Sequence, residues 1–424
     1  MDTINTRIEK LLENNPNICN NCLGRKVSDI VEGQDNPTRG QIIRNQLNLK
    51  EAEDCFICNN TFKYLDADKI LKKVNKKIER LNLEFNTFIV GTKLDKKILD
   101  LDKQINEDLD LNVELIKKEL NRIIGKTIEE NLNKEVEFNN PDVVIMVDLR
   151  KIPDETIVKI QINPLYIEGR YNKFSRGIPQ TKWPCTKCKG RGCDKCNGTG
   201  KQYSESVEEL ISEHVLIETE GYDAKFHGAG REDIDVRMLG TGRPFVLEIK
   251  EPKKRNIDLK LIEDKINKIN EGKTKYTNLK FTKRNRKAEI KQSSPDTYKV
   301  YKAQVECEKP INKEKLEELK QLHIIEQRTP TRVAHRRADK IRKKEVKELE
   351  LEYVDSYNFN MIIKTEGGLY IKELISGDDN RSKPSVSDIL ENKSICKYLD
   401  VIEVGIKWIK ILNYFIYYNK HNLY

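Results

Sequence analysis

Residues 228 to 250 read Gly-Ala-Gly-Arg-Glu-Asp-Ile-Asp-Val-Arg-Met-Leu-Gly-Thr-Gly-Arg-Pro-Phe-Val-Leu-Glu-Ile-Lys, and the rest of the chain is organised around this stretch. At the two-residue period of a strand, Asp233, Asp235 and Arg237 share one face, which points to a cleft or to solvent. The glycines on both sides permit tight turns that hold the two ends of the strand. An ordinary hairpin with a solvated, salt-bridged face explains this strand pattern equally well. The order Arg231-Glu232-Asp233 inside a glycine-framed loop favours a functional site instead.

The same stretch resembles the catalytic motif of the tRNA pseudouridine synthases of archaea and eukaryotes that act in the TΨC loop. That motif reads Gly-Arg-Glu-Asp-x-Asp-Val-Arg-x-Leu-Gly-x-Gly-Arg-Pro-Phe, and residues 230–245 contain every fixed position. The resemblance implies an α+β catalytic domain whose mixed sheet is split by a cleft. It also implies a cofactor-free isomerase that converts uridine 54, uridine 55 or both of tRNA to pseudouridine. In this resemblance the nucleophile is Asp233, and Arg231 binds the substrate.

Spacing alone does not separate Asp233 from Asp235, because both carboxylates stand on one face of the predicted strand. Asp233 completes the Arg-x-Asp unit that recurs across pseudouridine synthases of otherwise different sequence. Asp235 is expected to pair with Arg237 or Arg231 and so to hold the loop. A second strand is predicted over residues 245–249.

Composition predicts a globular protein with more than one domain. The chain has 424 residues, of which 35% are charged, and this length allows two or three domains. The formal net charge is +9, and residues 251–291 and 328–345 are locally rich in lysine and arginine. This distribution suits a polyanionic partner such as tRNA, although a solvated helix face is the commoner meaning of a charge run.

The start of the chain and its most apolar segment argue against secretion and against a membrane. Met1 leads directly into a charged amphipathic stretch, which predicts that there is no signal peptide. The apolar residues 404–418 are interrupted by Lys407, Lys410 and Asn413, so they do not form a membrane span. We therefore expect a cytoplasmic protein with no membrane contact, which acts as a monomer without a protein partner.

Ten cysteines in such a protein indicate metal ligation rather than disulfides. Two Cys-x-x-Cys knuckles near the start can supply four thiolates to one tetrahedral zinc ion: Cys19, Cys22, Cys55 and Cys58. No spare ligand accompanies them, so the predicted zinc site is structural and closed, and free thiols are the alternative. The related synthases carry an equivalent N-terminal cysteine set.

A second group of cysteines has the same pattern over a shorter distance: Cys185, Cys188, Cys193 and Cys196. Two knuckles so close together can in principle wrap one zinc ion in a tight loop. The glycines around them also resemble the repeats of chaperone zinc domains, in which each ion takes two repeats with more sequence between them. Eukaryotic members of the synthase family lack this knuckle, so we expect it to bind metal for structure and not for catalysis.

Helices alternate with buried strands in residues 1–160. Residues 65–82 and 105–122 have the apolar spacing of helices, whereas residues 143–147 form a short β-branched run typical of a buried strand. This order predicts an α/β layer, which resembles the THUMP-like RNA-binding domain of the archaeal synthases. We therefore expect a zinc-containing, RNA-binding domain over 1–160 and the catalytic domain over 161–424.

The first segment of the catalytic domain interleaves basic and aromatic residues, which together grip phosphates and stack on bases. The family has the same Gly-Arg-Tyr-Asn-Lys-Tyr/Phe-Ser-Arg run, which favours RNA contact over a packed hairpin with snorkelling cations. The predicted RNA contacts are Arg170, Tyr171, Lys173 and Arg176.

Two further motifs are expected to complete the site. Tyr301 lies in a Lys-x-Tyr-x-Ala sequence whose tyrosine packs on the target uracil in the family. Tyr370 and Lys372 lie in a stretch that resembles the family's Gly-Thr-Tyr-Ile-Lys-Glu sequence. The basic residue of this third motif pairs with the catalytic aspartate in pseudouridine synthases generally, and here that residue is Lys372.

A basic run over residues 328–337 also matches the family, and its predicted phosphate contacts are Arg332, His335 and Arg336. His335 can instead be read as a catalytic base, but the neighbouring arginines favour phosphate binding. The resemblance ends near residue 408, and residues 409–424 have no functional account.

Two other functions fit parts of the sequence. Asp233 or Asp235, followed by Glu248-Ile249-Lys250, fits the Asp…Glu-x-Lys pattern of magnesium-dependent nucleases. That short pattern leaves Tyr301 and residues 370–372 unexplained. A non-catalytic RNA-binding zinc protein would need only the cysteines and the basic surfaces, and the complete Arg-Glu-Asp motif argues against it.

Overall fold

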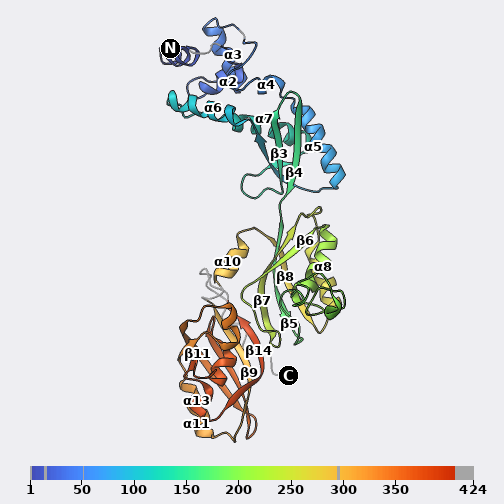
Figure 1. Cartoon of the computed structure of the whole chain (residues 1–424), viewed down its shortest axis with the longest axis vertical. Helices are drawn as coiled ribbons and strands as arrows, with labels where there is room; N and C mark the ends of the chain where they lie inside the picture. The colour runs from blue at the N-terminus through green and yellow to red at the C-terminus, as the bar shows by residue number, and fades with distance from the viewer. Residues whose placement is uncertain (1, 14–16, 51, 294–296, 406–424) are drawn as a thin grey trace. The chain divides into compact units, whose positions relative to one another are not determined.

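The computed structural model describes residues 2–13, 17–50, 52–293 and 297–405 (Figure 1). These residues form two compact units. The N-terminal unit comprises Met1–Leu165 with the short segments Thr219–Gly221 and Lys250–Asn256, and the C-terminal unit comprises the rest. The apolar segment after residue 405 and the unexplained residues 409–424 lie outside the described part. Within that part, no helix has the length and apolar character needed to cross a membrane.

The N-terminal unit consists of helices and a four-stranded sheet with the strand order β2-β1-β3-β4. β1 runs parallel to β2 and β3, whereas β3 and β4 are antiparallel. α5 and α7 pack against each other and on the sheet. The elements are α1 (Asp2–Leu12), α2 (Asn20–Lys26), α3 (Asn36–Gln46), α4 (Thr61–Tyr64), α5 (Ala67–Leu81), β1 (Thr87–Lys93), α6 (Lys96–Asp108), α7 (Ile116–Leu132), β2 (Glu135–Val136), β3 (Val143–Lys151) and β4 (Glu155–Ile162).

Local sequence explains where helix α5 begins and ends and which side it buries. The side chain of Asp66 accepts a hydrogen bond from the Lys69 amide and so caps the start of α5. Ile70, Leu71 and Val74 recur at helical spacing and are buried against the sheet. Asn82 then ends the helix in the left-handed conformation. The predicted helix over 65–82 is therefore confirmed, as is the buried strand over 143–147.

The helix predicted over 105–122 is wrong, because two helices meet in that interval. α6 ends at Asp108 and α7 begins only at Ile116. Asp110 adopts a φ of 51°, which a helix cannot accommodate, and the Leu111 amide turns back to the Asn106 carbonyl. The leucines between the two helices keep the apolar spacing of a helix, so the sequence pattern does not reveal the break.

A buried ionic network ties α2 to α6 and α7. The Arg25 guanidinium donates to Asp102 at 2.8 Å and to Glu119 at 2.9 Å, and Lys26 donates to Asp102 at 2.8 Å. Asp102 also accepts from the Ile116 amide at the start of α7. The Arg25, Lys26 and Asp102 side chains are fully buried, so each charge depends on its partners.

Asp102→Asn should destabilise the N-terminal unit by about 3–5 kcal/mol, because it leaves two buried cations without their shared carboxylate. Asp148→Asn is the matched control: Asp148 pairs with Arg150, whose side chain is 58% exposed, so its loss should cost at most about 1 kcal/mol. Native-state hydrogen exchange of the amides in β1 and β3 measures both values within the full chain. Equal effects of the two substitutions would show that the buried network is not what stabilises this unit.

The C-terminal unit is built on a ten-stranded sheet with the order β13-β10-β11-β12-β9-β14-β7-β5-β8, and β6 pairs with β7. Its elements are β5 (Leu165–Lys173), η1 (Asp194–Cys196), α8 (Val207–Thr219), β6 (Asp223–Gly228), β7 (Arg237–Lys250), α9 (Leu259–Ile269), β8 (Thr274–Thr282), α10 (Arg286–Ser293), β9 (Tyr298–Cys307), α11 (Lys313–Glu318), η3 (Leu319–Gln321), β10 (Ile324–Arg328), η4 (Thr331–Arg336), β11 (Ile341–Tyr353), β12 (Asn358–Glu366), α12 (Ile371–Ser376), β13 (Ser382–Lys383), α13 (Val386–Leu390) and β14 (Ser394–Val404).

This sheet is mixed, and a short parallel junction lies inside it. β14 pairs with β9 antiparallel along most of its length, but it meets β7 in parallel through only Asp400↔Arg237 and Val401↔Met238. A pocket opens beside this junction, and both Val401 and Leu399 of β14 line it. The predicted α+β fold with a mixed sheet and a cleft is therefore confirmed.

The strand predicted over Asp233–Arg237 is wrong, because this segment is a turn between β6 and β7. The Val236 amide donates to the Asp233 carbonyl, and β7 starts only at Arg237. The Lys173 Nζ donates to the carbonyls of Asp233 and Ile234, which replaces the neighbouring strand that a sheet would supply. The second strand predicted over residues 245–249 is the far half of the single strand β7.

Candidate active site

A pocket of about 420 Å³ lies beside the β14–β7 junction of the C-terminal unit. It brings together the residues of three separate sequence motifs: Arg231, Asp233, Tyr301, Tyr370 and Lys372. Eight lysines and arginines line the pocket against only two acidic residues. The lining therefore favours an anionic ligand.

Asp233 is held by two cations that come from different parts of the chain. Arg332 of η4 lies 3.0 Å from one carboxylate oxygen, and Lys372 of α12 lies 3.7 Å from the other. Arg332 also donates to the nearly buried Glu373. Burial opposes the charge on Arg332, but Glu373 and Asp233 outweigh it and raise the pKa of the guanidinium. The Asp233 side chain remains 32% exposed toward the pocket, so a ligand can reach it.

Asp235 pairs with the same lysine, Lys372. Lys372 donates to both of its carboxylate oxygens, at 2.7 and 2.9 Å. Burial alone would raise the pKa of Asp235, but Lys372 outweighs burial and lowers it. The expected pairing of Asp235 with Arg237 or Arg231 is therefore corrected. Arg237 instead makes a two-point ion pair with Asp400 of β14.

Two tyrosines and a buried lysine form another wall of the pocket. Tyr301 projects from β9, and burial raises its pKa to about 12, so the hydroxyl stays neutral. Tyr370 precedes α12, and the Arg332 guanidinium lies 5.7 Å from its ring centroid. Burial and the nearby Arg243 lower the pKa of Lys299 to about 7. The wall therefore offers aromatic faces and an amine that can lose its proton near neutral pH.

A buried carboxylate supports the turn that carries Asp233. Glu232 is 6% exposed and accepts hydrogen bonds from the Tyr171 hydroxyl, at 2.8 and 2.9 Å, and from Arg243, at 2.9 Å. The Lys173 ammonium lies 4.0 Å from the same carboxylate. Tyr171 and Lys173 are each 0% exposed. Their predicted RNA contact is therefore corrected: they face inward because the loop needs a donor for each buried acceptor.

The other predicted RNA contacts have different environments. Arg170 donates to the carbonyls of residues 241, 242 and 404, and Arg176 donates to Asp400 and to the carbonyls of residues 235 and 399. Arg332 lines the pocket, as described above, and His335 is exposed beside it in the sequence. The Arg336 side chain lies outside the described part. RNA contact by these residues stays a prediction.

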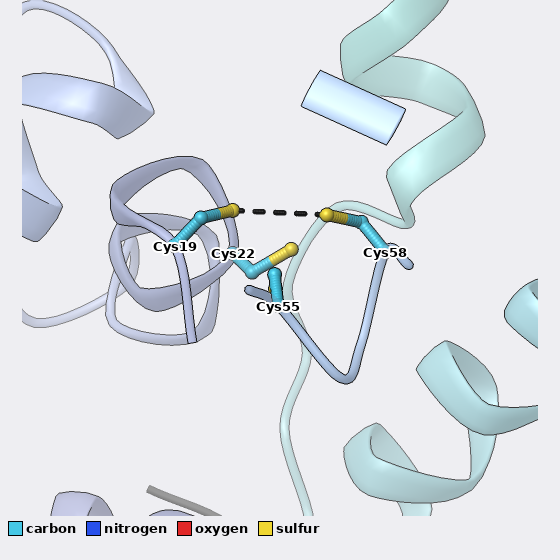
Figure 2. A group of neighbouring side chains, drawn as sticks. All are labelled: Cys19, Cys22, Cys55 and Cys58. Carbon is cyan, nitrogen blue, oxygen red and sulfur yellow. Dashed lines mark hydrogen bonds between the residues drawn. The ribbon is translucent and has the colours of Figure 1, made fainter. Parts of the chain in front are cut away.

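The first cysteine group forms a compact cluster at the start of α2 and in the turn before α4 (Figure 2). The sulfur atoms of Cys19, Cys22, Cys55 and Cys58 all lie within 4.8 Å of one another, and those of Cys19 and Cys58 are 3.8 Å apart. Four sulfurs bound tetrahedrally at about 2.3 Å from zinc are about 3.8 Å apart. The cluster therefore has the donor set and the size of a closed zinc site.

The second cysteine group has the same geometry. The sulfur separations are 3.9 Å for Cys185 and Cys193, 3.8 Å for Cys188 and Cys196, and 3.7 Å for Cys193 and Cys196. Backbone amides of Gly192, Cys193 and Gly200 point at the sulfurs, as they do toward thiolates. All four sulfurs converge on one point, so the cluster suits one zinc ion, and the chaperone-like arrangement with separate repeats does not apply.

Comparison with known proteins identifies the family. Residues 166–405, more than half of the chain, match the family described as "Pus10, C-terminal", and residues 67–148 match "Pus10 THUMP domain, archaeal". The chain belongs to the Pus10 family. Its relatives include proteins named "tRNA pseudouridine synthase Pus10". The predicted family and the THUMP domain are thus confirmed.

Three archaeal Pus10 relatives show how much of the chain the likeness covers. The protein of Methanothermobacter marburgensis is 50% identical over 403 residues, or 95% of this chain and 99% of that protein. The protein of Methanocaldococcus jannaschii is 49% identical over 358 residues, or 84% and 76%. The protein of Methanosphaera stadtmanae is 47% identical over 369 residues, or 84% and 90%. The likeness therefore includes both units of the chain.

The alternative of a magnesium-dependent nuclease is wrong. It requires Glu248 to gather a metal ion with Asp233 or Asp235. Glu248 instead binds His227 at 2.8 Å and Lys287 at 3.0 Å, and it does not line the Pus10 pocket. Among the described residues, the groups able to hold a metal ion are the two cysteine clusters.

Sequence reasoning missed Arg332 as a partner of Asp233, and it missed the buried Glu232. The basic run around Arg332 indicated phosphate binding, and nothing local distinguishes the one arginine that turns toward a carboxylate. For Glu232 a signal existed: it lies inside the Arg231-Glu232-Asp233 unit, whose middle residue had no assigned role.

Glu232→Gln should destabilise the C-terminal unit by about 3–5 kcal/mol, because the buried Arg243 guanidinium loses its carboxylate. Asp235→Asn provides the control in the same turn, since the Asp235 side chain is 60% exposed and its ion pair should contribute about 1 kcal/mol or less. Hydrogen exchange of the β7 amides gives both values. If the two variants lose similar stability, Glu232 is not the support of the turn.

Proposed function

We propose that this protein is a tRNA pseudouridine synthase that isomerises uridine 54, uridine 55 or both in the TΨC loop, with Asp233 as the nucleophile. One observation carries the proposal: Asp233 lines a cationic pocket that two tyrosines also line, and its carboxylate has Arg332 at 3.0 Å and Lys372 at 3.7 Å. The names of the Pus10 relatives support the same reaction.

The reaction requires a carboxylate beside the ribose of a uridine that has left its stack. Asp233 either attacks C1′ directly or removes a proton at C2′, and in both cases the bond between C1′ and N1 breaks. The freed uracil rotates, and a new bond forms between C5 and C1′ as the bond from Asp233 to C1′ breaks or, in the second route, as the proton returns to C2′. C5 then loses its proton and N1 gains one. No atom is added or lost, so the isomerisation needs no cofactor. Arg332 and Lys372 orient the carboxylate and balance its charge.

The remaining pocket residues fit the two ends of the substrate. Tyr301 offers its ring to the uracil, and Tyr370 with Arg332 forms a second stacking surface. Arg231 and the basic residues of η4 and β11, including Arg337 and Arg342, suit the flanking phosphates. His335 and Arg336 follow Arg332 along the same segment and are proposed to extend this contact.

The two parts of the chain are proposed to have different functions. We infer that residues 1–160 bind tRNA through the THUMP domain and that residues 161–424 catalyse the isomerisation. Both cysteine clusters are proposed to hold zinc ions that stabilise the fold and take no part in the reaction. The cytoplasmic location and the monomeric state stay predictions from the sequence.

Asp233→Asn should abolish pseudouridine formation and leave tRNA binding within about twofold, because the amide keeps the shape but is too weak a nucleophile or base. Asp235→Asn should lower the rate only in part, since Asp235 acts through Lys372. The assay incubates unmodified tRNA with the protein and maps pseudouridine by carbodiimide primer extension, which also shows whether uridine 54, 55 or both react. An active Asp233→Asn with an inactive Asp235→Asn would transfer the role to Asp235.

Elemental analysis of protein purified without chelator should find two zinc ions per chain, one for each cysteine cluster. Cys19→Ser and Cys185→Ser should each remove one, because a site with three thiolates binds zinc far more weakly. Cys307→Ser is the control, since Cys307 lies in neither cluster. Metal-free protein with an unchanged fold would contradict the zinc proposal.

A further inference from the structure

The second cysteine cluster stands on an aromatic stem. Its chain leaves the domain after Trp183 and returns at Tyr203, and these two rings meet edge to face with centroids 5.5 Å apart. The stem is closed by the Gln202 amide, which donates to the Trp183 carbonyl at 2.9 Å, and by a β-bridge between Pro184 and Lys201. The position of the stem therefore depends on how the intervening loop closes.

The same stem touches the turn that carries Asp233. The Arg231 guanidinium lies over the Trp183 ring, 4.8 Å from its centroid, within the range of a cation–π contact. Three residues before Trp183, the Gln180 side chain donates to the Gly230 carbonyl at 3.0 Å. Gly230 and Arg231 both line the pocket. The stem therefore contacts the start of the Arg231-Glu232-Asp233 unit from outside the pocket.

The loop between the stem residues has hydrogen bonds within its turns, such as that from the Cys185 amide to the Gly200 carbonyl at 2.7 Å, but it has no apolar core. In residues 184–201, regular structure is limited to the three-residue helix η1 and the bridge at the ends. The buried side chains within this loop are those of Cys185 and Cys188. A loop without an apolar core relies on a cross-link or a metal ion for its shape. The four converging sulfurs supply the ligands for one.

We propose that Trp183 is a positioning residue that holds Arg231, and with it the turn bearing Asp233, and that metal in the Cys185–Cys196 cluster fixes Trp183 in place. The inference rests on the proposed function for its kinetic consequence, and its structural part stands independently. It gives the second cluster a role that a purely local zinc site lacks. Loss of metal from this loop would displace the Trp183 ring, and this displacement would alter the position of Arg231 in the pocket.

The structural part can be read from fluorescence. The chain has two tryptophans, Trp183 and Trp408, so Trp408→Phe leaves Trp183 as the single tryptophan, and excitation beyond the absorption of tyrosine reports on it alone. In that background, Cys185→Ser should shift the Trp183 emission maximum and increase quenching by iodide, because the ring loses its packing. The matched control is Cys19→Ser, which removes a ligand of the other cluster and should leave the emission unchanged. Unaltered emission in both variants would overturn the link between metal and Trp183.

The kinetic part uses Trp183→Leu and Trp183→Phe. The leucine variant removes the aromatic face, and misplacement of the turn that bears Asp233 should lower kcat about 10- to 100-fold. KM for tRNA should rise less than kcat falls, because Arg231 is only one of several proposed phosphate contacts. The phenylalanine variant keeps an aromatic face and should restore most of the rate. Zinc content should be unchanged in both, which separates a positioning role from collapse of the cluster.

Three outcomes would overturn the proposal. Full kcat in Trp183→Leu would show that the indole positions nothing. A rise in KM with unchanged kcat would show that Trp183 affects RNA binding alone and does not position the turn that bears Asp233. Equal losses in the leucine and phenylalanine variants, with displaced zinc, would reduce Trp183 to a structural residue. If the unaltered protein forms no pseudouridine, the proposed function fails, while the fluorescence comparison still tests the link between the metal and the indole.

Discussion

The buried carboxylate of Glu232 is the interaction on which the pocket depends. It accepts hydrogen bonds from Arg243 and from the Tyr171 hydroxyl, and the Lys173 ammonium lies nearby. All three of these side chains are buried. Such a cluster is stable only when each member is present, because a single unpaired charge in this interior costs several kcal/mol. Because Glu232 must keep these partners, the backbone of the neighbouring residue Asp233 is held in one position. A reactive carboxylate gains a defined position without being buried itself.

A second ionic contact keeps the two sides of the sheet in register where they scarcely pair. β14 and β7 share two residue pairs, too few for a ladder to resist separation. Asp400 of β14 compensates by binding Arg237 of β7 through two bonds and Arg176 through a third. Arg176 also donates to the Asp235 carbonyl. The short junction thus leaves room for the pocket. The ion pairs of the two arginines with Asp400 connect the strands where backbone hydrogen bonds are few.

The family motifs predicted which residues gather in the pocket, because the resemblance implies that the residues of separate motifs share one site. It predicted that Lys372 lies beside Asp233, but it did not predict the other contacts that hold these residues. The two-residue period placed Asp233 on a strand, since no local signal announces that a lysine sixty residues earlier, Lys173, will satisfy the carbonyls of the turn. The basic and aromatic run around Tyr171 resembled an RNA surface, because composition does not tell an outward face from an inward one. Arg332 became a partner of Asp233 only through folding over 99 residues of chain.

The two cysteine clusters would place a bound zinc ion in different electrostatic surroundings. A zinc ion with four thiolates carries a net charge of about −2, which is costly away from water. The first cluster is buried, and the Arg25 guanidinium lies 3.6 Å from the Cys22 sulfur as part of a network of buried ions. The second lies in an exposed loop, where backbone amides and solvent suffice. The Arg25 guanidinium, which also pairs with Asp102 and Glu119, is thus placed to offset part of the charge that zinc with four thiolates would carry there.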